Sequence, residues 1–413
     1  MSEINSGNMK LFNRPFYSQK IKPYIGKGLI KVLTGQRRVG KSYIMLQIMN
    51  EIAKENASAN IIWINKEKSE FSFIRNDQTF SDYVSTKLIT GKDNFLFVDE
   101  IQEIEGFENV LRSLQANNDC DIFCTGSNAN LLSGELSTFL SGRYIEFHIY
   151  SLSYTEFLIF HALSDSDESL MKYFTYGGLP HLAHLSLNDD LVVEYLQNIY
   201  STILLKDIVA RENIRNVDFL ENLSAYLADS VGSLFSAQSI SKYLKSQHTQ
   251  MSTSAILSYL RAMGNAFIVN KVQRYDIRGK RKFELNEKYY FEDIGLRNSL
   301  SGVNINKDIQ KLMENAVFLQ LKMLGYKVFV GKFDSCEIDF VGQKNNKTIY
   351  IQVAYMLLNE ETKKREFGNL KLIADNYPKY VVSLDPFNSG SDYEGIKHIH
   401  LREFLKMTIV DFE

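Results

Sequence analysis

Proline, cysteine and tryptophan are scarce in this 413-residue sequence, which contains five, three and one of them. So few prolines exclude a collagen-like or Pro-rich linker chain. Three cysteines are too few for a disulfide framework, so we expect a reduced compartment. Cys120 and Cys124 alternate with apolar residues, and no second Cys/His pair lies near them to complete a zinc site. We therefore expect both to be small buried strand residues.

Net charge and long apolar runs are also missing. The 47 basic and 49 acidic side chains leave a formal net charge of −2, so any affinity for nucleic acid must come from a local patch. The longest apolar runs fall far short of the roughly 20 residues that span a bilayer, and the first residues lack a signal-peptide pattern. The sequence predicts a soluble, cytoplasmic protein without a membrane partner.

The rest of the composition is typical of folded domains. Apolar residues make up 45% and charged residues 23% of the chain, as in globular proteins and unlike disordered ones. At about 100–200 residues per domain, the length predicts two to four domains.

A glycine-rich turn lies between an apolar run at 28–35 and a helical pattern at 41–53. It fits G-x-x-x-x-G-K-[ST] in full, and the strand before it and the helix after it are the context that this phosphate-binding motif requires. Its two glycines allow successive backbone N–H groups to turn inward and form an anion nest. We predict that nine residues bind the nucleotide: Gly35, Gln36, Arg37, Arg38, Val39, Gly40, Lys41, Ser42 and Tyr43.

Catalysis at such a loop also needs a carboxylate that holds a metal ion. Lys41 would place its charge on the β- and γ-phosphates, and Ser42 would offer its hydroxyl to Mg²⁺. In the run 94–101, four apolar residues lead into Asp99 and Glu100, the pattern of a buried parallel strand with acids at its ligand-binding end. Asp99 would hold Mg²⁺ and Glu100 would orient and deprotonate the attacking water. The alternative is a turn without a ligand.

Three further features border this predicted site. The strand-like run 121–128 ends in small polar residues, so Thr125, Ser127 or Asn128 either contacts the γ-phosphate or the lytic water, or caps the helix that follows. Arg143 precedes a strand-like run at 145–150. It is either a surface residue or a cation that neutralises transition-state charge, in cis or from a neighbouring subunit. Residues 13–17 lie before the first strand and could border the adenine.

Four segments together resemble a known family. They are GQRRVGKS at 35–42, FLFVDEIQ at 95–102, TGSNANLL at 125–132 and SGRYIEFHIYSLSYTEF at 141–157. The chain resembles the predicted ATPases of the AAA+ superfamily that carry a C-terminal domain of unknown function. The segments YGGLP at 176–180 and KDI at 206–208 are similar to the middle of that family. The resemblance implies a P-loop sheet in which the strand ending at Thr125 lies between the phosphate-loop strand and the Asp99 strand. It also supports Arg143 as an arginine finger or sensor, and it implies no cellular role.

The middle of the chain has two parts. Residues 151–215 are helical in pattern, and in an ATPase of this type they would form a lid. In residues 216–304, helical runs at 217–231, 236–245 and 252–264 precede strand-like runs at 267–275 and 282–285, which is a winged-helix pattern. The residues 289–291 are expected in the core. Basic side chains in the turn between these two runs could contact DNA phosphates. A structural or protein-contact role for this segment is equally compatible with the sequence. The basic residues are Arg278, Lys280, Arg281 and Lys282.

The last part, 305–413, has the element order of a restriction-endonuclease-like fold: helix, three strands, helix, strand. Glu314 and Asp339 lie where the metal site of that fold would be. The next strand should carry acid-x-Lys, but it reads Gln352-Val353-Ala354. Phosphodiester hydrolysis needs several carboxylates and a base or cation that activates water. We therefore predict a degenerate nuclease site at Glu314, Asp339 and Gln352, kept for binding or assembly.

The sequence thus predicts a multidomain α/β fold: a P-loop ATPase core at 1–150, a helical lid at 151–215, a winged-helix-like domain at 216–304 and an inactive nuclease-like domain at 305–413. The predicted function is Mg²⁺-dependent hydrolysis of ATP to ADP and phosphate, used as a switch or motor. The alternatives are an ATP-gated DNA-binding regulator and an ATP-dependent nuclease. The predicted partners are ATP, DNA through the winged helix, and a second copy of the chain or a client protein. The predicted catalytic residues are Lys41, Glu100, Thr125, Ser127 and Arg143.

Overall fold

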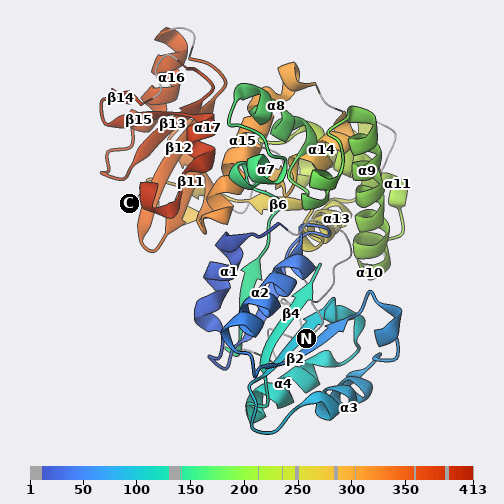
Figure 1. Cartoon of the computed structure of the whole chain (residues 1–413). Helices are drawn as coiled ribbons and strands as arrows, with labels where there is room; N and C mark the ends of the chain where they lie inside the picture. Colours follow the sequence, from blue (N-terminus) through green and yellow to red (C-terminus); the bar gives the residue numbers. More distant parts are fainter. Residues whose placement is uncertain are drawn as a thin grey trace. The chain divides into compact units, whose positions relative to one another are not determined.

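The computed structural model describes residues 12–129, 140, 142–212, 214–234, 236–246, 251–282, 287–302, 304–357, 360–386 and 390–412. The chain forms two compact units (Figure 1): Met1–Ile149 with Asn265–Phe267, and Tyr150–Gly264 with Ile268–Glu413. Two predictions lie partly outside the described residues. They are the helix that Ser127 or Asn128 would cap and the strand 282–285 beyond Lys282.

The first unit contains a five-stranded parallel sheet in the order β2-β3-β4-β1-β5. Strands β1, β3 and β4 consist mostly of apolar and β-branched residues. Every residue of β1 and nearly every residue of β3 and β4 is buried, as expected for parallel strands covered on both faces. The predicted position of the strand ending near Thr125 is confirmed, because β4 lies between β1 and β3. The strands are β1 (Ile30–Thr34), β2 (Asn60–Asn65), β3 (Asn94–Asp99), β4 (Asp121–Gly126) and β5 (Tyr144–His148).

Helices and short turns connect these strands. Cys124 is a buried residue of β4, as predicted, whereas Cys120 is half-buried and directly precedes that strand; both are free thiols. The elements are α1 (Pro15–Ile21), η1 (Lys22–Tyr24), α2 (Lys41–Glu55), η2 (Ser69–Phe71), α3 (Asp77–Lys87), η3 (Ile101–Glu103) and α4 (Phe107–Asn117).

The second unit begins with helices. In its core, α14 packs against α8, α9 and α11. No helix within the described ranges is long and apolar enough to cross a membrane. These elements are α7 (Tyr154–Phe160), α8 (Asp167–Tyr176), η4 (Pro180–His184), α9 (Asp189–Thr202), the π-helical η5 (Ile203–Val209), α10 (Ala210–Glu212), α11 (Val217–Asp229), α12 (Ala237–Ser246), α13 (Thr253–Asn265) and α14 (Ile294–Ser301).

A long hairpin follows the three helices that we predicted in the winged-helix segment. Its base is β6 (Val269–Val272) paired with β9 (Lys288–Phe291), and its outer part is β7 (Arg274–Asp276) paired with β8 (Arg281–Lys282). The outer part does not project as a free wing. Instead, β7 pairs in parallel with β10 (Lys327–Phe333) and extends the C-terminal sheet.

The C-terminal sheet has eight strands in the order β14-β15-β13-β12-β11-β10-β7-β8. Phe340 packs near Phe318 of α15, whereas its neighbour Val341 shares a core cluster with Phe367 of α16. Because alternate strand residues face opposite ways, α15 and α16 cover opposite faces of the sheet. The predicted order of elements is present: α15 (Ile305–Met323), β10, β11 (Cys336–Lys344), β12 (Lys347–Ala354), α16 (Glu360–Lys371), β13 (Lys379–Ser383), then β14 (Asp392–Tyr393), β15 (Ile396–His400), α17 (Leu401–Lys406) and η6 (Ile409–Phe412).

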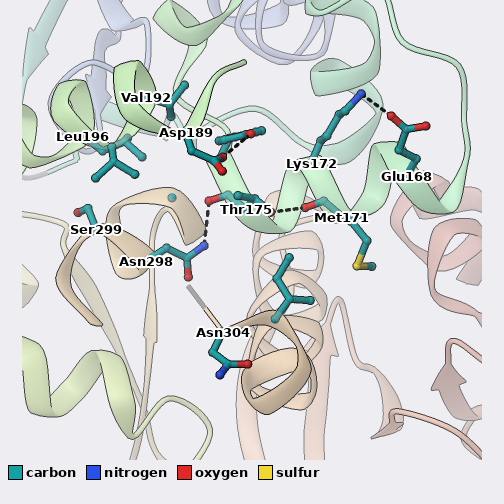
Figure 2. Close-up of a pocket in the computed structure, with 14 residues that line it drawn as sticks. Glu168, Met171, Lys172, Thr175, Asp189, Val192, Leu196, Asn298, Ser299 and Asn304 are labelled. Atoms are coloured by element: carbon teal, nitrogen blue, oxygen red, sulfur yellow. Dashed lines mark hydrogen bonds and ion pairs between the residues drawn. The ribbon is translucent and has the colours of Figure 1, made fainter. Parts of the chain in front are cut away.

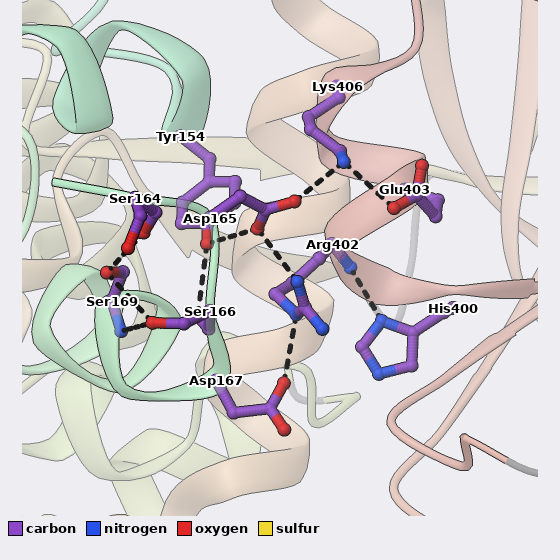
Figure 3. Close-up of polar contacts among 10 residues, drawn as sticks. All are labelled: Tyr154, Ser164, Asp165, Ser166, Asp167, Ser169, His400, Arg402, Glu403 and Lys406. Atoms are coloured by element: carbon purple, nitrogen blue, oxygen red, sulfur yellow. Dashed lines mark hydrogen bonds and ion pairs between the residues drawn. The ribbon is translucent and has the colours of Figure 1, made fainter.

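Ion pairs tie α17 to the segment between α7 and α8 within this second unit (Figure 3). Arg402 bridges Asp165 at 3.0 Å and Asp167 at 2.9 Å, and Lys406 reaches the other oxygen of Asp165 at 2.7 Å. The Tyr154 hydroxyl also donates to Asp165, at 2.9 Å. The C-terminal helix is therefore fastened to residues more than 230 positions earlier in the chain.

Candidate functional site

The phosphate-loop motif forms the connection between β1 and α2. Gly35 has φ 137° and Gly40 has φ 95°, values that glycine adopts without a side-chain penalty. A Cβ at Gly35 would lie 2.2 Å from the carbonyl oxygen of Ile149, so no other residue fits there. Gly40 directly precedes the first residue of α2. The loop thus presents the amino end of a 15-residue helix, which favours a bound anion.

Lys41 is held inside this loop. Its side chain is 5% exposed, and Nζ donates to the carbonyl oxygens of Gly35 and Gln36 at 2.9 and 3.0 Å. The loop backbone therefore fixes the ammonium group where the motif predicts phosphate oxygens. Arg37, Arg38 and Val39 belong to the same turn, and Val39 is buried; Tyr43 lies in the first turn of α2 and is 40% exposed. The amide of Gln36 is buried, and among the described residues it has no hydrogen-bond partner.

Asp99 lies at the carboxyl end of β3, and two hydroxyl groups contact it. Thr125 Oγ1 donates to Asp99 Oδ1 at 2.6 Å, and the side chain of Ser42 is hydrogen-bonded to the same carboxylate. Burial raises the pKa of Asp99, and these two hydrogen bonds and Lys41 only partly oppose it. Oδ2 of Asp99 is buried and pairs with no group in the described part of the chain. A bare carboxylate oxygen beside a serine hydroxyl fits a Mg²⁺ ligand pair.

Glu100 follows directly, in the left-handed conformation with φ 55°. Its backbone N–H donates to Thr125 Oγ1 at 2.9 Å, and its Oε2 accepts hydrogen bonds from Ser127 at 3.0 Å and from Gln102. Burial would raise the pKa of Glu100, but Lys41, Gln102, Arg37 and Ser127 outweigh burial and lower it. The side chain is thus kept as a carboxylate, the form that a general base requires.

Two contacts here were not predicted. Gln102, in the turn η3, holds Glu100, and it lies only two residues after it. Arg14 lies in the segment that we expected near the adenine, but it is buried and its Nη1 donates to the carbonyl oxygen of Val39 in the phosphate loop, at 3.0 Å. Its guanidinium also lies 4.6 Å from the ring centre of Tyr17. Arg14 therefore braces the loop from outside.

Arg143 is not brought to this site within one chain. Tyr144 pairs with Ile30, and the Ile30 N–H donates to the Arg143 carbonyl at 2.9 Å. Arg143 therefore lies at the amino end of β1, whereas the phosphate loop follows the carboxyl end, after Thr34. Four residues of strand, about 13 Å, separate the two edges. This arrangement argues against the cis alternative, and both a surface residue and a contribution to a neighbouring subunit stay compatible with it.

The predicted DNA-contacting residues lie on the outer hairpin, and acids pair with two of them. Arg278 forms an ion pair with Asp334 at 2.9 Å, and Arg281 with Asp276 at 3.5 Å. Lys282 lies 4.9 Å from the ring centre of Phe329. Lys280 lies at the tip, with φ 50°. Only part of the predicted positive charge is therefore free for phosphates.

The three residues of the predicted degenerate nuclease site do converge. Asp339 on β11 faces Gln352 on β12, whose Oε1 accepts from the Asp339 N–H at 3.4 Å, and Glu314 on α15 lies beside them in a buried cluster. A fourth member was not predicted: Lys288 of β9 lies 3.6 Å from Glu314 and 3.8 Å from Asp339. No group of three or more His, Cys, Asp or Glu in the described ranges is placed to hold a metal ion.

A separate pocket of about 850 Å³ lies in the second unit, between α8, α9 and α14 (Figure 2). Charged groups on its wall are paired with other wall residues, Lys172 with Glu168 at 2.7 Å and Tyr176 with Asp189 at 2.6 Å. None of the predicted site residues lines it.

The sheet order and the glycine loop define a P-loop nucleotide-binding fold, and comparisons with known proteins agree. Residues 27–158 match a family model described as an AAA domain, and residues 167–307 match one described as a domain of unknown function (DUF8612). The chain belongs to the AAA+ superfamily of P-loop ATPases, which confirms the predicted family.

Two relatives match most of the chain. An uncharacterized protein of Haemophilus influenzae is 36% identical over 403 residues, 96% of this chain and 98% of that protein. The uncharacterized protein MJ1544 of Methanocaldococcus jannaschii is 30% identical over 355 residues, 82% and 77% of the two chains. Among solved structures, the Walker-type ATPase paby2304 of Pyrococcus abyssi has a TM-score of 0.49 at 15% identity, over 70% of this chain and 95% of that one.

Proposed function

We propose that this protein binds ATP at the loop 35–42 and hydrolyses it to ADP and phosphate, with Mg²⁺ as cofactor. The observation that supports this most is the pair of adjacent carboxylates at the end of β3. Among the described residues, one buried oxygen of Asp99 next to Ser42 has no partner, and Lys41, Gln102 and Ser127 favour the ionised form of Glu100. Two acids in distinct environments are suited to distinct roles.

The proposed roles follow from these environments. Lys41 and the loop N–H groups bind the phosphates, Ser42 and Asp99 hold the metal ion, and Glu100 accepts the proton of the attacking water. Mg²⁺, when bound, neutralises charge on the phosphate oxygens. Ser127 and Thr125 act as positioning residues, since they contact the carboxylates. Arg143 supplies its cation to a neighbouring subunit.

Helical segments beside a P-loop ATPase commonly respond to nucleotide state, so we propose that residues 151–215 act as the lid of a nucleotide-driven switch or motor. A client protein or a second copy of the chain would be the partner.

Nucleotide binding tests the first step. Fluorescent ATP should bind wild type in the presence of Mg²⁺, and Lys41→Ala should weaken binding about tenfold or more, equivalent to about 1.4 kcal/mol. Lys54→Ala, at the exposed far end of the same helix, is the matched control and should bind as wild type does. Equal affinity of wild type and Lys41→Ala would contradict the proposed site.

A further inference from the structure

A buried cluster of charges lies in the second unit, whereas the phosphate loop belongs to the first. It contains three carboxylates, Glu314 of α15 and Glu337 and Asp339 of β11, around the ammonium group of Lys288 of β9. Nζ of Lys288 lies 2.8 Å from Glu337, 3.6 Å from Glu314 and 3.8 Å from Asp339. Lys288 is 2% exposed, and only Glu337 reaches solvent appreciably, with 34% of its side chain exposed.

Protein groups occupy the remaining positions around these acids. The Tyr290 hydroxyl and the Gln310 amide donate to the two oxygens of Glu314, both at 3.2 Å. The Val353 N–H donates to Oδ2 of Asp339 at 2.8 Å. The backbone at Gly232 closes over Glu314 so tightly that a Cβ there would lie 2.5 Å from its Oε2. The cluster is therefore enclosed, with little room for a metal ion and its waters.

The same contacts attach β9 to the C-terminal sheet. Lys288 and Tyr290 point into the cluster from this strand, and the Asn315 side chain of α15 exchanges two 2.8 Å hydrogen bonds with the backbone of Phe291. The Tyr290 ring stacks on Phe318 with ring centres 4.8 Å apart. Four consecutive residues of β9 are buried in this way.

These observations differ from what a nuclease-like domain requires. Such a domain would hold a divalent cation between the acids at positions 314 and 339, with a lysine two residues after an acid on β12. Here β12 offers the neutral Gln352 amide and Ala354, and a cationic side chain from another strand fills the centre. A buried cluster of carboxylates needs a compensating cation, and Lys288 provides it.

We infer that the ammonium group of Lys288 takes the place of a divalent metal ion in this carboxylate cluster. The cluster then attaches β9 to the C-terminal sheet without binding a metal ion. The domain then cleaves no phosphodiester bond, and its acids serve to fasten the hairpin strand to α15 and β11.

Protonation supports this assignment. Burial opposes charge on Lys288, but the carboxylates, led by Glu314, outweigh it and raise the pKa of Lys288, so the ammonium is retained at neutral pH. Burial and the neighbouring Glu314 raise the pKa of Asp339, which disfavours its charged form. A metal ligand has to be deprotonated, so this shift opposes metal binding at Asp339.

Thermal unfolding with and without metal tests the inference. All measurements use nucleotide-free full-length protein carrying Asp99→Asn, so that the phosphate-loop site does not contribute. The parent should unfold at the same temperature in EDTA and in saturating MnCl₂. Adding Lys288→Met should lower Tm in EDTA by roughly 5–10 °C, since it leaves buried carboxylates without their cation.

Lys271→Met is the matched control, because the Lys271 side chain on the paired strand β6 is 46% exposed and pairs with one carboxylate, Glu287, which is 11% exposed. It should lower Tm by less than Lys288→Met does. Stabilisation of the parent by MnCl₂ that disappears with Asp339→Asn would overturn the inference, as would an unchanged Tm in Lys288→Met. If Lys288→Met does not fold, the comparison of the parent's Tm in EDTA and in MnCl₂ still tests the inference. Mn²⁺-dependent DNA cleavage by wild type that Asp339→Asn abolishes would also overturn it.

Discussion

The Thr125 hydroxyl donates to the Asp99 carboxylate at 2.6 Å and accepts from the N–H of Glu100 at 2.9 Å. One side chain on β4 thus orients the Asp99 carboxylate and holds the backbone of Glu100, which directly follows β3. Hydrogen bonds between adjacent strands therefore position both residues.

Replacing Thr125 with valine keeps its shape and removes both hydrogen bonds. We expect Thr125→Val to lower the ATP hydrolysis rate by about 10–100-fold, the range seen when groups that orient metal ligands are lost. Affinity for ATP measured in EDTA should stay within about twofold, because the phosphate loop is untouched. Thr125→Ser keeps the hydroxyl and serves as the control. A hydrolysis rate of Thr125→Val equal to that of wild type would show that the Thr125 hydroxyl does not position Asp99 and Glu100 for catalysis.

The register of β1 and β5 places Arg143 at the sheet edge opposite the phosphate loop. Arg143→Ala should therefore bind ATP normally and lose about 10³-fold in hydrolysis, as enzymes without their arginine finger do. Mixing Arg143→Ala with Lys41→Ala should recover activity, because each subunit then lacks a different half of a shared site. Arg112→Ala, exposed on α4, is the control. A single-substitution rate equal to wild type, or an inactive mixture, would refute the shared site.

Paired charges limit what the hairpin tip contributes to any DNA affinity. Asp334 and Asp276 already engage Arg278 and Arg281, which leaves Lys280 and Lys282 for phosphates. Each phosphate contact adds about −0.9 to the slope of log affinity against log salt. Lys280→Glu with Lys282→Glu should thus flatten the slope by about two, measured by fluorescence anisotropy. Arg278→Glu with Arg281→Glu should flatten it less. An equal effect of both pairs would show that the acids do not compete with DNA.

The α17 contacts predict a pH dependence of stability. Burial would raise the pKa of Asp165, but hydrogen bonds from Lys406, Arg402 and Tyr154 outweigh it and lower the pKa to about 2. Since the folded-state pKa lies below the unfolded one, the stabilisation is complete above about pH 4 and is lost as pH falls toward 2.

Asp165→Asn should therefore unfold a few degrees below wild type at pH 7, and the two Tm values should converge between pH 4 and 2. Differential scanning calorimetry measures both. Glu168→Gln, which removes a fully exposed partner of Lys172, is the control. A constant Tm difference across this pH range would show that ionisation of Asp165 does not stabilise the contact.

The sequence was sufficient for the parts of the site that are contiguous. The phosphate loop, Asp99 and Glu100 each lie in one short motif, and the position of β4 between β1 and β3 followed from the family resemblance. The hydrogen bond from Gln102 was not predictable, because it depends on the left-handed backbone of Glu100 and the turn after it. Likewise, a strand register decides where Arg143 lies, and sequence patterns do not fix the register.

Ion pairs between residues far apart in the chain could not be predicted from the sequence either. Lys288 precedes three aromatic residues that we correctly expected in the core, yet its partners lie 26 or more positions later. Arg278 and Asp334 are 56 residues apart. Pairing of this kind depends on which strand edges meet, here β7 with β10, and that is a property of the folded chain.

Phosphate release by wild type and Glu100→Gln, measured with ATP and Mg²⁺ alongside nucleotide binding, tests the central claim most directly. We predict that wild type releases phosphate, whereas Glu100→Gln binds ATP with an affinity within about twofold of wild type and loses at least about 100-fold in release, since only the general base is removed. Glu103→Gln, on the exposed side of the same turn, should hydrolyse as wild type does. Equal phosphate release by wild type and Glu100→Gln would contradict the account.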